Sequence, residues 1–169
     1  MPSGKYILKV CLLGDGAVGK TSLVRRFVYD VFDDRYLMSF GTKVVKKTLK
    51  VGKAELDLMI WDILGQKSQE ALHAAYYRGA AGALAVCDFT RPETMKNLKS
   101  WLGSFRSVVG DMPVIILGNK SDLDKKYALG DLKEYGSSVG CDVMETSAKT
   151  GLNVEDAFRE LGEKLVEAL

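Results

Sequence analysis

GDGAVGKT, at residues 14–21, follows directly on the apolar run YILKVCLL at residues 6–13. The apolar run predicts a buried strand, and SLVRRFVYD at residues 22–30 predicts a helix. Three glycines therefore stand where a strand turns into a helix, and a lysine and a threonine close the stretch. Such glycines let the backbone curl until successive N–H groups point inward. Because the helix N-terminus adds its dipole, the turn favours a bound anion.

The same stretch fits the P-loop pattern, in which two glycines separated by four residues precede Lys and Ser or Thr. In that pattern the lysine reaches the β- and γ-phosphates of a nucleotide, and the next hydroxyl binds Mg²⁺. Lys20 and Thr21 take these two positions. The residues predicted to line the phosphates and the metal through this loop are Asp15, Gly16, Ala17, Val18, Gly19, Lys20, Thr21 and Ser22.

Short apolar runs alternate with helical patterns along the chain, without a repeat or a dividing linker, so residues 1–169 are expected to form one domain. Two strands joined by a tight turn at Gly52 alternate polar and apolar residues, as an antiparallel hairpin at a sheet edge does. The pattern predicts an α/β fold with a doubly wound, mostly parallel six-stranded sheet, one antiparallel edge strand and about five helices. Strands are expected at 5–13, 41–51, 54–63, 83–89, 112–120 and 141–148, and helices at 22–30, 69–79, 91–109, 129–139 and 153–169.

The composition of the chain excludes several classes of function and location. A net charge of +2 is too small to indicate nucleic-acid binding. The three cysteines lie in or beside apolar runs, which predicts reduced thiols in the cytoplasm. No apolar run approaches the roughly 20 residues that a membrane span needs. The last residues, EKLVEAL, hold no cysteine for a prenyl group, so the chain as given is expected to be an unanchored monomer.

A second candidate stretch is DILG at residues 62–65, which follows the apolar strand LDLMIW. A carboxylate at a strand end can hold Mg²⁺ through a water, and a glycine can offer its N–H to a γ-phosphate. Alone, this would be an ordinary turn. Beside a P-loop it predicts Asp62 as a metal ligand and Gly65 as a phosphate contact, with Gln66 placed to orient a water.

Two further stretches follow strands and suit a guanine base. Asp122, in NKSD at residues 119–122, can accept two parallel N–H bonds from guanine N1 and N2, for which adenine has no matching donors. The stem of Lys120 can cover the base, and backbone N–H groups of TSAK at residues 146–149 can bond guanine O6. The plain alternative is a polar turn capped by an asparagine. The predicted base contacts are Asn119, Lys120, Asp122, Ser147, Ala148 and Lys149.

These four stretches, in this order and over nearly the whole chain, resemble the small GTPases of the Ras superfamily. WDILGQ at 61–66, followed by AAYYRGAAGALAVCDFT at 74–90, is most similar to the Rab branch. The resemblance implies a GTPase (G) domain that hydrolyses GTP to GDP with Mg²⁺ and acts as a molecular switch, as in vesicle trafficking. It also implies effectors, an exchange factor and a GTPase-activating protein as partners, and membrane association only through a lipidated tail.

The resemblance carries roles to single residues. It places Phe32 against the guanine edge, Tyr36 over the phosphates and Ser39 on Mg²⁺, where the family has threonine. Phe32 and Tyr36 have the alternative of being plain surface or core aromatics. For catalysis it implies in-line attack of water, with Gln66 positioning the water while Lys20 and the Gly65 amide stabilise the charge.

The sequence departs from the family near the predicted γ-phosphate. Leu64 stands where a small residue is usual, Ile63 where Thr is usual and Lys67 where Glu is usual. These changes favour an alternative, a binding module that holds GTP or GDP and hardly hydrolyses. A third hypothesis, a P-loop nucleotide kinase, shares only residues 14–21 and leaves NKSD unexplained. Beside the switch, Met38, Phe40 and Trp61 predict an apolar effector surface, and the lysines of residues 43–50 predict a solvated edge.

Overall fold

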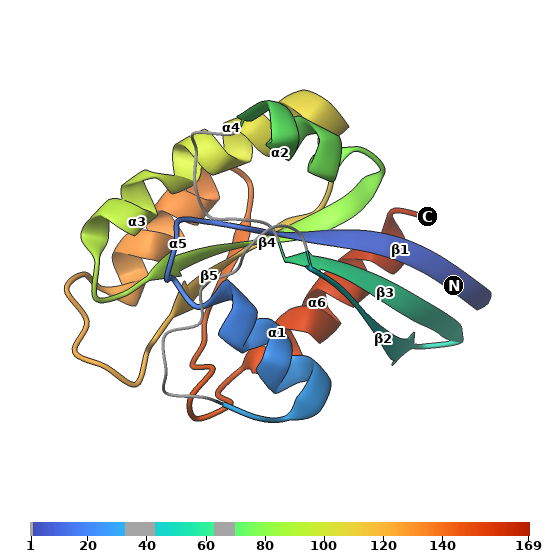
Figure 1. Ribbon diagram of the computed structural model, residues 1–169, viewed down its shortest axis with the longest axis horizontal. Helices are drawn as coiled ribbons and strands as arrows, with labels where there is room; N and C mark the ends of the chain where they lie inside the picture. Colours follow the sequence, from blue (N-terminus) through green and yellow to red (C-terminus); the bar gives the residue numbers. More distant parts are fainter. Residues whose placement is uncertain (1, 33–42, 63–69) are drawn as a thin grey trace.

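The computed structural model describes residues 2–32, 43–62 and 70–169, and its centre is a six-stranded sheet (Figure 1). Its strands are β1 (Gly4–Leu13), β2 (Lys43–Val51), β3 (Ala54–Asp62), β4 (Ala80–Asp88), β5 (Val114–Asn119) and β6 (Asp142–Glu145). They lie in the order β2-β3-β1-β4-β5-β6. β2 runs antiparallel to β3 and every other neighbouring pair runs parallel. The predicted sheet with one antiparallel edge strand is confirmed.

Helices cover both faces of the sheet (Figure 1). They are α1 (Lys20–Tyr29), α2 (Glu70–Tyr77), α3 (Pro92–Lys96), α4 (Leu98–Val109), α5 (Leu129–Ser138) and α6 (Val154–Glu167). α1 and α6 pack on one face, and the apolar cluster on the other face takes residues from α2, α4 and α5. None of the helices in the described part of the chain is long and apolar enough to cross a membrane.

Strand burial follows from this layering. Every residue of β5 is buried, as expected for a strand in a parallel sheet covered on both faces. β3 alternates between buried and half-buried residues, because its Leu56, Leu58 and Ile60 face α1 and α6 while the intervening side chains lie on the less covered face. β2 is largely exposed, as an edge strand rich in lysine is expected to be.

Two predicted elements differ in detail. The helix expected at 91–109 is interrupted at Asn97, where the backbone stays right-handed (φ −73°, ψ −13°) and the side chain turns toward the loop after β1. The strand expected at 141–148 ends at Glu145. Beyond it, the Thr146 N–H donates to Gly118 and the Thr146 carbonyl accepts from Ser121, so this segment bridges to the end of β5 instead.

Phe158 tests how far the core depends on the packing of α6 against α1. Its ring, fully buried, stacks on Phe27 with centroids 4.0 Å apart and planes 2° from parallel. Phe158→Ala is expected to lower the free energy of unfolding by about 3–5 kcal/mol, measured by urea denaturation, because it leaves a cavity between the two helices. Leu152→Ala, at an exposed position, serves as control and should change it by less than about 0.5 kcal/mol. Equal losses for both variants would contradict this packing.

Candidate functional site

The loops that carry the sequence motifs meet at one edge of the sheet. β1, β3, β4 and β5 are parallel neighbours, so their carboxyl ends lie together. The GDGAVGKT loop follows β1, Asp62 ends β3, Asp88 ends β4 and Asn119 ends β5. In open α/β sheets this edge is where ligands bind.

The loop at residues 14–19 has all of its carbonyl groups held by hydrogen bonds. Lys20 Nζ donates to the carbonyls of Gly14 (2.7 Å) and Asp15 (2.9 Å), and the Leu23 N–H donates to that of Gly19 (2.9 Å). The other three carbonyls accept from distant side chains: Gly16 from Arg91 Nη2 (2.8 Å), Ala17 from Lys120 Nζ (2.8 Å) and Val18 from Asn119 Nδ2 (2.9 Å). In a planar trans peptide the C=O and the following N–H point in opposite directions. The N–H groups of Ala17, Val18 and Gly19 are therefore turned away from Arg91, Lys120 and Asn119, as an anion-binding loop requires.

Sterics explain two of the loop's glycines. Gly14 has φ 134°, and a Cβ there would lie 2.2 Å from the Val86 carbonyl oxygen. Gly19 has φ 103°, and its Cβ would lie 2.2 Å from Asn119 Nδ2. Neither position accepts a side chain. Gly16 is different, since a Cβ there meets no described atom within 4 Å. The described part of the fold therefore does not demand glycine at position 16.

Asp15 has its carboxylate held by two side chains of the α3–α4 region. Its two oxygens accept hydrogen bonds from Asn97 Nδ2 (2.7 Å) and Trp101 Nε1 (2.8 Å). Trp101 is buried in α4, and Asn97 is the residue at which the helix is interrupted. The sequence predicted a nucleotide contact at Asp15 through the backbone of the loop, and that prediction concerns other atoms than the carboxylate, which these two donors hold.

Lys20 is a buried cation. Only 7% of it is exposed, and burial lowers the pKa of its ammonium to about 8, against the opposing charges of Asp62 and Asp15. A buried charge is costly unless it is paired. An anion bound against the loop would supply that pairing.

A pair of oxygens suits a magnesium ion. The Thr21 hydroxyl donates to Asp62 Oδ2 at 2.5 Å, and Asp62 is 2% exposed. Mg²⁺ prefers oxygen ligands and keeps several waters, so one hydroxyl and one carboxylate are a fitting donor set. The third predicted ligand, Ser39, lies outside the described residues.

The loops after β5 and β6 are tied to each other and to the phosphate loop. Asn119 donates to Val18 and its Oδ1 accepts from the Thr146 hydroxyl at 3.0 Å. The Ser147 hydroxyl donates to Asp122 Oδ1 at 2.7 Å, which orients the carboxylate predicted to bind guanine. Of the remaining predicted contacts, Ser22 lies in the first turn of α1 and Phe32 is 36% exposed just beyond it.

Three residues of this region, Arg26, Asp88 and Arg91, were not predicted from the sequence motifs. The buried Asp88 binds Lys120 Nζ at 2.9 Å and Arg91 Nε at 3.2 Å. Arg26 donates to the carbonyls of Ala148 and Lys149 from 122 and 123 residues away. A carboxylate at the end of the apolar run ALAVC was a signal for Asp88, whereas nothing in the sequence linked Arg26 to residues so distant.

Several predicted residues are not placed. Tyr36, Ser39, Gly65 and Gln66, with the departures at 63, 64 and 67, lie outside the described residues. A separate groove of about 540 Å³ lies between the C-terminal end of α1, β2 and the start of α6. It mixes Arg26, Lys47 and Arg159 with Asp30 and Glu155 and contains none of the motif residues, so we do not assign the nucleotide to it.

A parallel sheet whose first strand runs through such a loop into a helix has the architecture of P-loop nucleotide hydrolases. Comparison with known proteins narrows this class. The Ras family model matches residues 9–167. The chain is similar to the Ras-related protein Rab-31 of Homo sapiens, with 40% identity over 161 residues that cover 94% of this chain and 83% of that protein.

Two other relatives come from distant organisms. Rab-21 of Dictyostelium discoideum is 38% identical over 161 residues, covering 94% of this chain and 76% of that protein. RABA4b of Arabidopsis thaliana is 39% identical over 164 residues, covering 94% and 73%. The chain therefore belongs to the Ras family of small GTPases, which hydrolyse GTP, and the predicted resemblance to its Rab members is confirmed.

Ala17 is the strained residue of the phosphate loop, because it has φ 63° in a region where a Cβ costs roughly 1 kcal/mol or more. Ala17→Gly is therefore expected to raise the free energy of unfolding of the nucleotide-free protein by about 1 kcal/mol, measured by urea denaturation. The control is Ala75→Gly on the exposed side of α2, which should lower it by about 0.5–1 kcal/mol. The same sign of change for both variants would show that Ala17 is not strained.

Proposed function

We propose that this small GTPase is a molecular switch that slowly hydrolyses GTP and binds effectors in its GTP form. The observation that supports the proposal is the phosphate loop, whose carbonyls at Gly16, Ala17 and Val18 are held from behind by Arg91, Lys120 and Asn119. Its N–H groups then form a cradle of the right size and sign for the β- and γ-phosphates. We further propose that residues 1–169 act as one GTPase domain and as a monomer.

In this mechanism, water attacks the γ-phosphorus in line with the bridging oxygen. The new O–P bond forms as the bond to the bridging oxygen breaks, and the products are GDP and phosphate. Lys20 and the loop amides stabilise the negative charge that grows on the phosphate oxygens. Gln66 positions the water and the Gly65 N–H binds the γ-phosphate, both by resemblance to the family. Thr21, Ser39 and Asp62 would hold Mg²⁺, which neutralises part of the charge on the phosphates.

Guanine recognition is assigned to the loops after β5 and β6. Asp122 would accept the N1 and N2 hydrogens, in an orientation that its bond from Ser147 supports. Lys120, anchored on Ala17 and Asp88, would cover one face of the base with its stem. The backbone of Ala148 and Lys149 would serve O6, because the bonds from Arg26 hold this turn in place. Phe32 and Tyr36 keep their proposed places beside the base and the phosphates.

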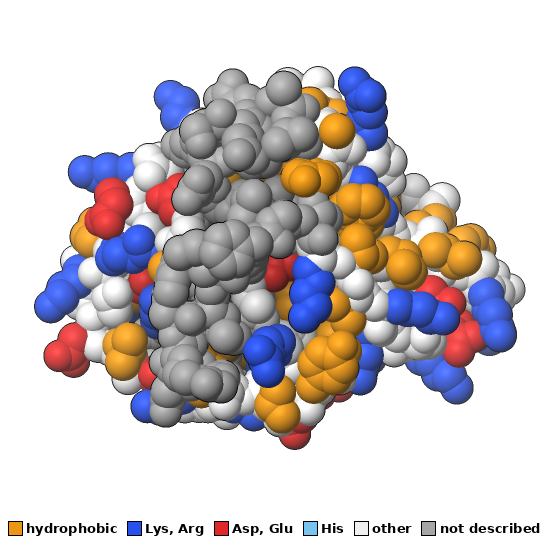
Figure 2. Space-filling view, viewed as in Figure 1, with side chains coloured by type: hydrophobic (Ala, Val, Ile, Leu, Met, Phe, Trp, Pro, Cys, Tyr) orange, Lys and Arg blue, Asp and Glu red, His pale blue; other side chains and the backbone are white. Residues whose placement is uncertain are grey.

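An apolar surface beside the switch segments supports effector binding. It consists of Val44, Met59, Trp61 and Tyr76, which lie on the less covered face of β2 and β3 and on α2. The rings of Trp61 and Tyr76 are 6.3 Å apart, and Lys9 Nζ lies 3.8 Å above the Trp61 ring. Figure 2 shows hydrophobic and basic side chains together on this side of the molecule. An effector with apolar and acidic side chains fits this surface; an exchange factor and a GTPase-activating protein would act at the same switch segments.

The proposal includes a cytoplasmic location for the protein, with attachment to membrane surfaces where a lipidated tail is present. All three cysteines are free and buried, as expected where thiols stay reduced. The alternative function, a binding module that holds its nucleotide without converting it, rests on Leu64 and Lys67.

Hydrolysis separates these two functions. Protein pre-loaded with GTP and Mg²⁺ is expected to convert it to GDP in a single turnover at a rate on the order of 10⁻⁴ s⁻¹, the scale of Ras proteins without an activating partner. Gln66→Leu, which removes the water-positioning amide, should abolish the conversion. Tight binding of GTP with no conversion by the unaltered protein would instead establish the nucleotide-locked module.

Base specificity depends on one carboxylate. Asp122→Asn is expected to weaken GTP binding by at least about 100-fold and to favour xanthosine triphosphate, because the amide donates where the carboxylate accepted. Asp124→Asn, two residues along the same exposed loop, is the matched control and should leave both affinities unchanged. The measurement is competition of GTP, XTP and ATP against a fluorescent GDP analogue. Unchanged preference in Asp122→Asn would overturn the guanine assignment.

A further inference from the structure

The carbonyl of Gly16 is held by a residue that none of the four motifs contains. Arg91 stands at the start of α3, and its Nη2 donates to the Gly16 oxygen at 2.8 Å. Its Nε binds Asp88 Oδ2 at 3.2 Å, so the guanidinium bridges the end of β4 and the phosphate loop. The side chain is 36% exposed, and the carboxylate behind it is fully buried.

The carboxylate of Asp88 pairs with two cations, Arg91 and Lys120. Burial alone would raise the pKa of its carboxyl, but hydrogen bonds from Lys120 and Thr90 lower it overall, so the group stays charged. The same oxygen that binds Arg91 binds Lys120 Nζ at 2.9 Å. Lys120 in turn donates to Ala17, the carbonyl next to that of Gly16. One buried carboxylate therefore directs two cations at consecutive carbonyls of the loop.

A cation on a carbonyl oxygen changes the N–H group at the other end of the same peptide. The peptide is conjugated, so electron density drawn to the oxygen leaves the nitrogen more positive and its N–H a stronger donor. Arg91 acts in this way on the N–H of Ala17, and Lys120 on that of Val18. Both amides belong to the part of the loop that cradles the β- and γ-phosphates.

Strengthening a donor matters most where charge grows. During hydrolysis, negative charge increases on the phosphate oxygens, so a more strongly polarised N–H stabilises the transition state more than bound GTP or GDP. An arginine supplied by a partner would approach from the open side of the site. Arg91 lies behind the loop and acts through the peptide.

We propose that Arg91 is a positioning residue for GTP hydrolysis. Held by Asp88, it fixes and polarises the peptide between Gly16 and Ala17, whose N–H faces the reacting phosphates. This inference rests on the proposed GTPase function.

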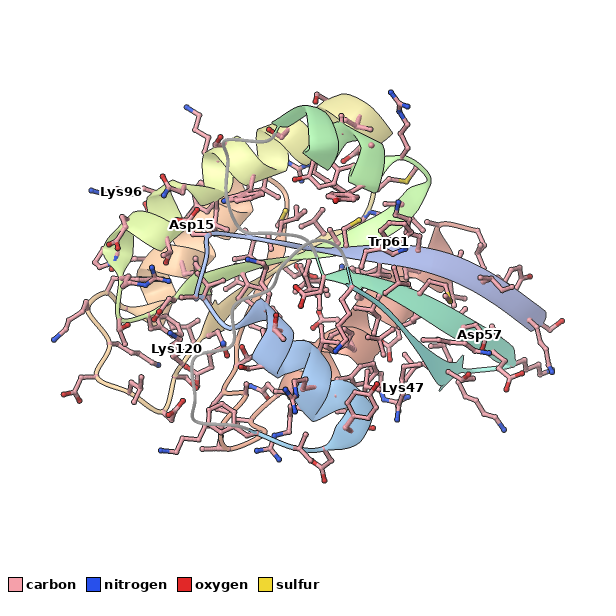
Figure 3. The ribbon with its side chains drawn as sticks, viewed as in Figure 1. Asp15, Lys47, Asp57, Trp61, Lys96 and Lys120 are labelled. Carbon is pink, nitrogen blue, oxygen red and sulfur yellow. The ribbon has the colours of Figure 1, made fainter. Side chains whose placement is uncertain are left out.

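The test separates polarisation from simple attachment of the loop. Arg91→Gln keeps a side-chain donor for the Gly16 carbonyl but removes the charge, and Arg91→Lys keeps the charge. Arg91→Gln is expected to slow single-turnover GTP hydrolysis roughly 10-fold, less than the 10²–10³-fold lost when a whole donor is removed. Its GDP dissociation rate should change by less than about 3-fold. Arg91→Lys, which keeps the charge but loses the two-nitrogen fork, should hydrolyse GTP faster than Arg91→Gln. Lys96→Gln, exposed on the same helix and pointing away in Figure 3, is the charge-matched control and should hydrolyse GTP normally.

A second readout follows the peptide itself. In the GDP-loaded protein, the amide proton of Ala17 is expected to move upfield in Arg91→Gln, while that of Gly19, whose peptide is bonded by Asn119, stays in place. Equal hydrolysis rates in Arg91→Gln and the unaltered protein, or a parallel fall of hydrolysis and GDP affinity with no selective shift at Ala17, would overturn the role of Arg91 alone. Absence of hydrolysis in the unaltered protein would overturn the proposed function, and the role of Arg91 with it.

Discussion

A loop whose N–H groups point toward a ligand needs hydrogen-bond donors for its carbonyl groups on the other side. The arrangement of the strands and helices around residues 14–19 supplies these donors. Buried carbonyls without partners are costly, and here each one from Gly14 to Gly19 is bonded. Most of the donors are remote in sequence: Arg91 lies 75 residues from Gly16, and Lys120 lies 103 residues from Ala17. The strand order β1-β4-β5 brings these donors behind the loop. The strand order is therefore part of the site.

The sequence predicted the fold class and the four motifs because each depends on residues close together in the chain. A strand, a glycine loop and a helix are adjacent in the phosphate loop, and a carboxylate at the end of an apolar run marks Asp62 and Asp122. What it could not predict are contacts set by side-chain direction across strands. The bond of Arg26 to Ala148 and the shared use of Asp88 by Arg91 and Lys120 depend on how α1, α3 and β5 are placed.

Asp15 and Asn97 are two further residues whose side-chain contacts the sequence did not predict. The motif predicted a backbone contact at Asp15 but not the direction of its side chain, which bonds to Asn97 and to Trp101 of α4. The helical pattern over residues 91–109 predicted no interruption, and the structure has one at the residue that reaches Asp15. The two observations concern the same bonds, because the interruption lies at the residue that, with Trp101, donates to the Asp15 carboxylate.

The charges around the loop also explain why binding and stability are coupled in this fold. Three cations, Lys20, Arg91 and Lys120, converge on the loop, and burial already lowers the pKa of Lys20. The Asp88 carboxylate balances the two at the back of the loop, but Lys20 lies in the cradle, where a phosphate is its natural counter-ion. A nucleotide bound as proposed would return the Lys20 charge to a favourable environment and so stabilise the folded state over the unfolded one. On this proposal the nucleotide-free protein is the less stable form, because its buried lysine lacks the phosphate as a counter-ion.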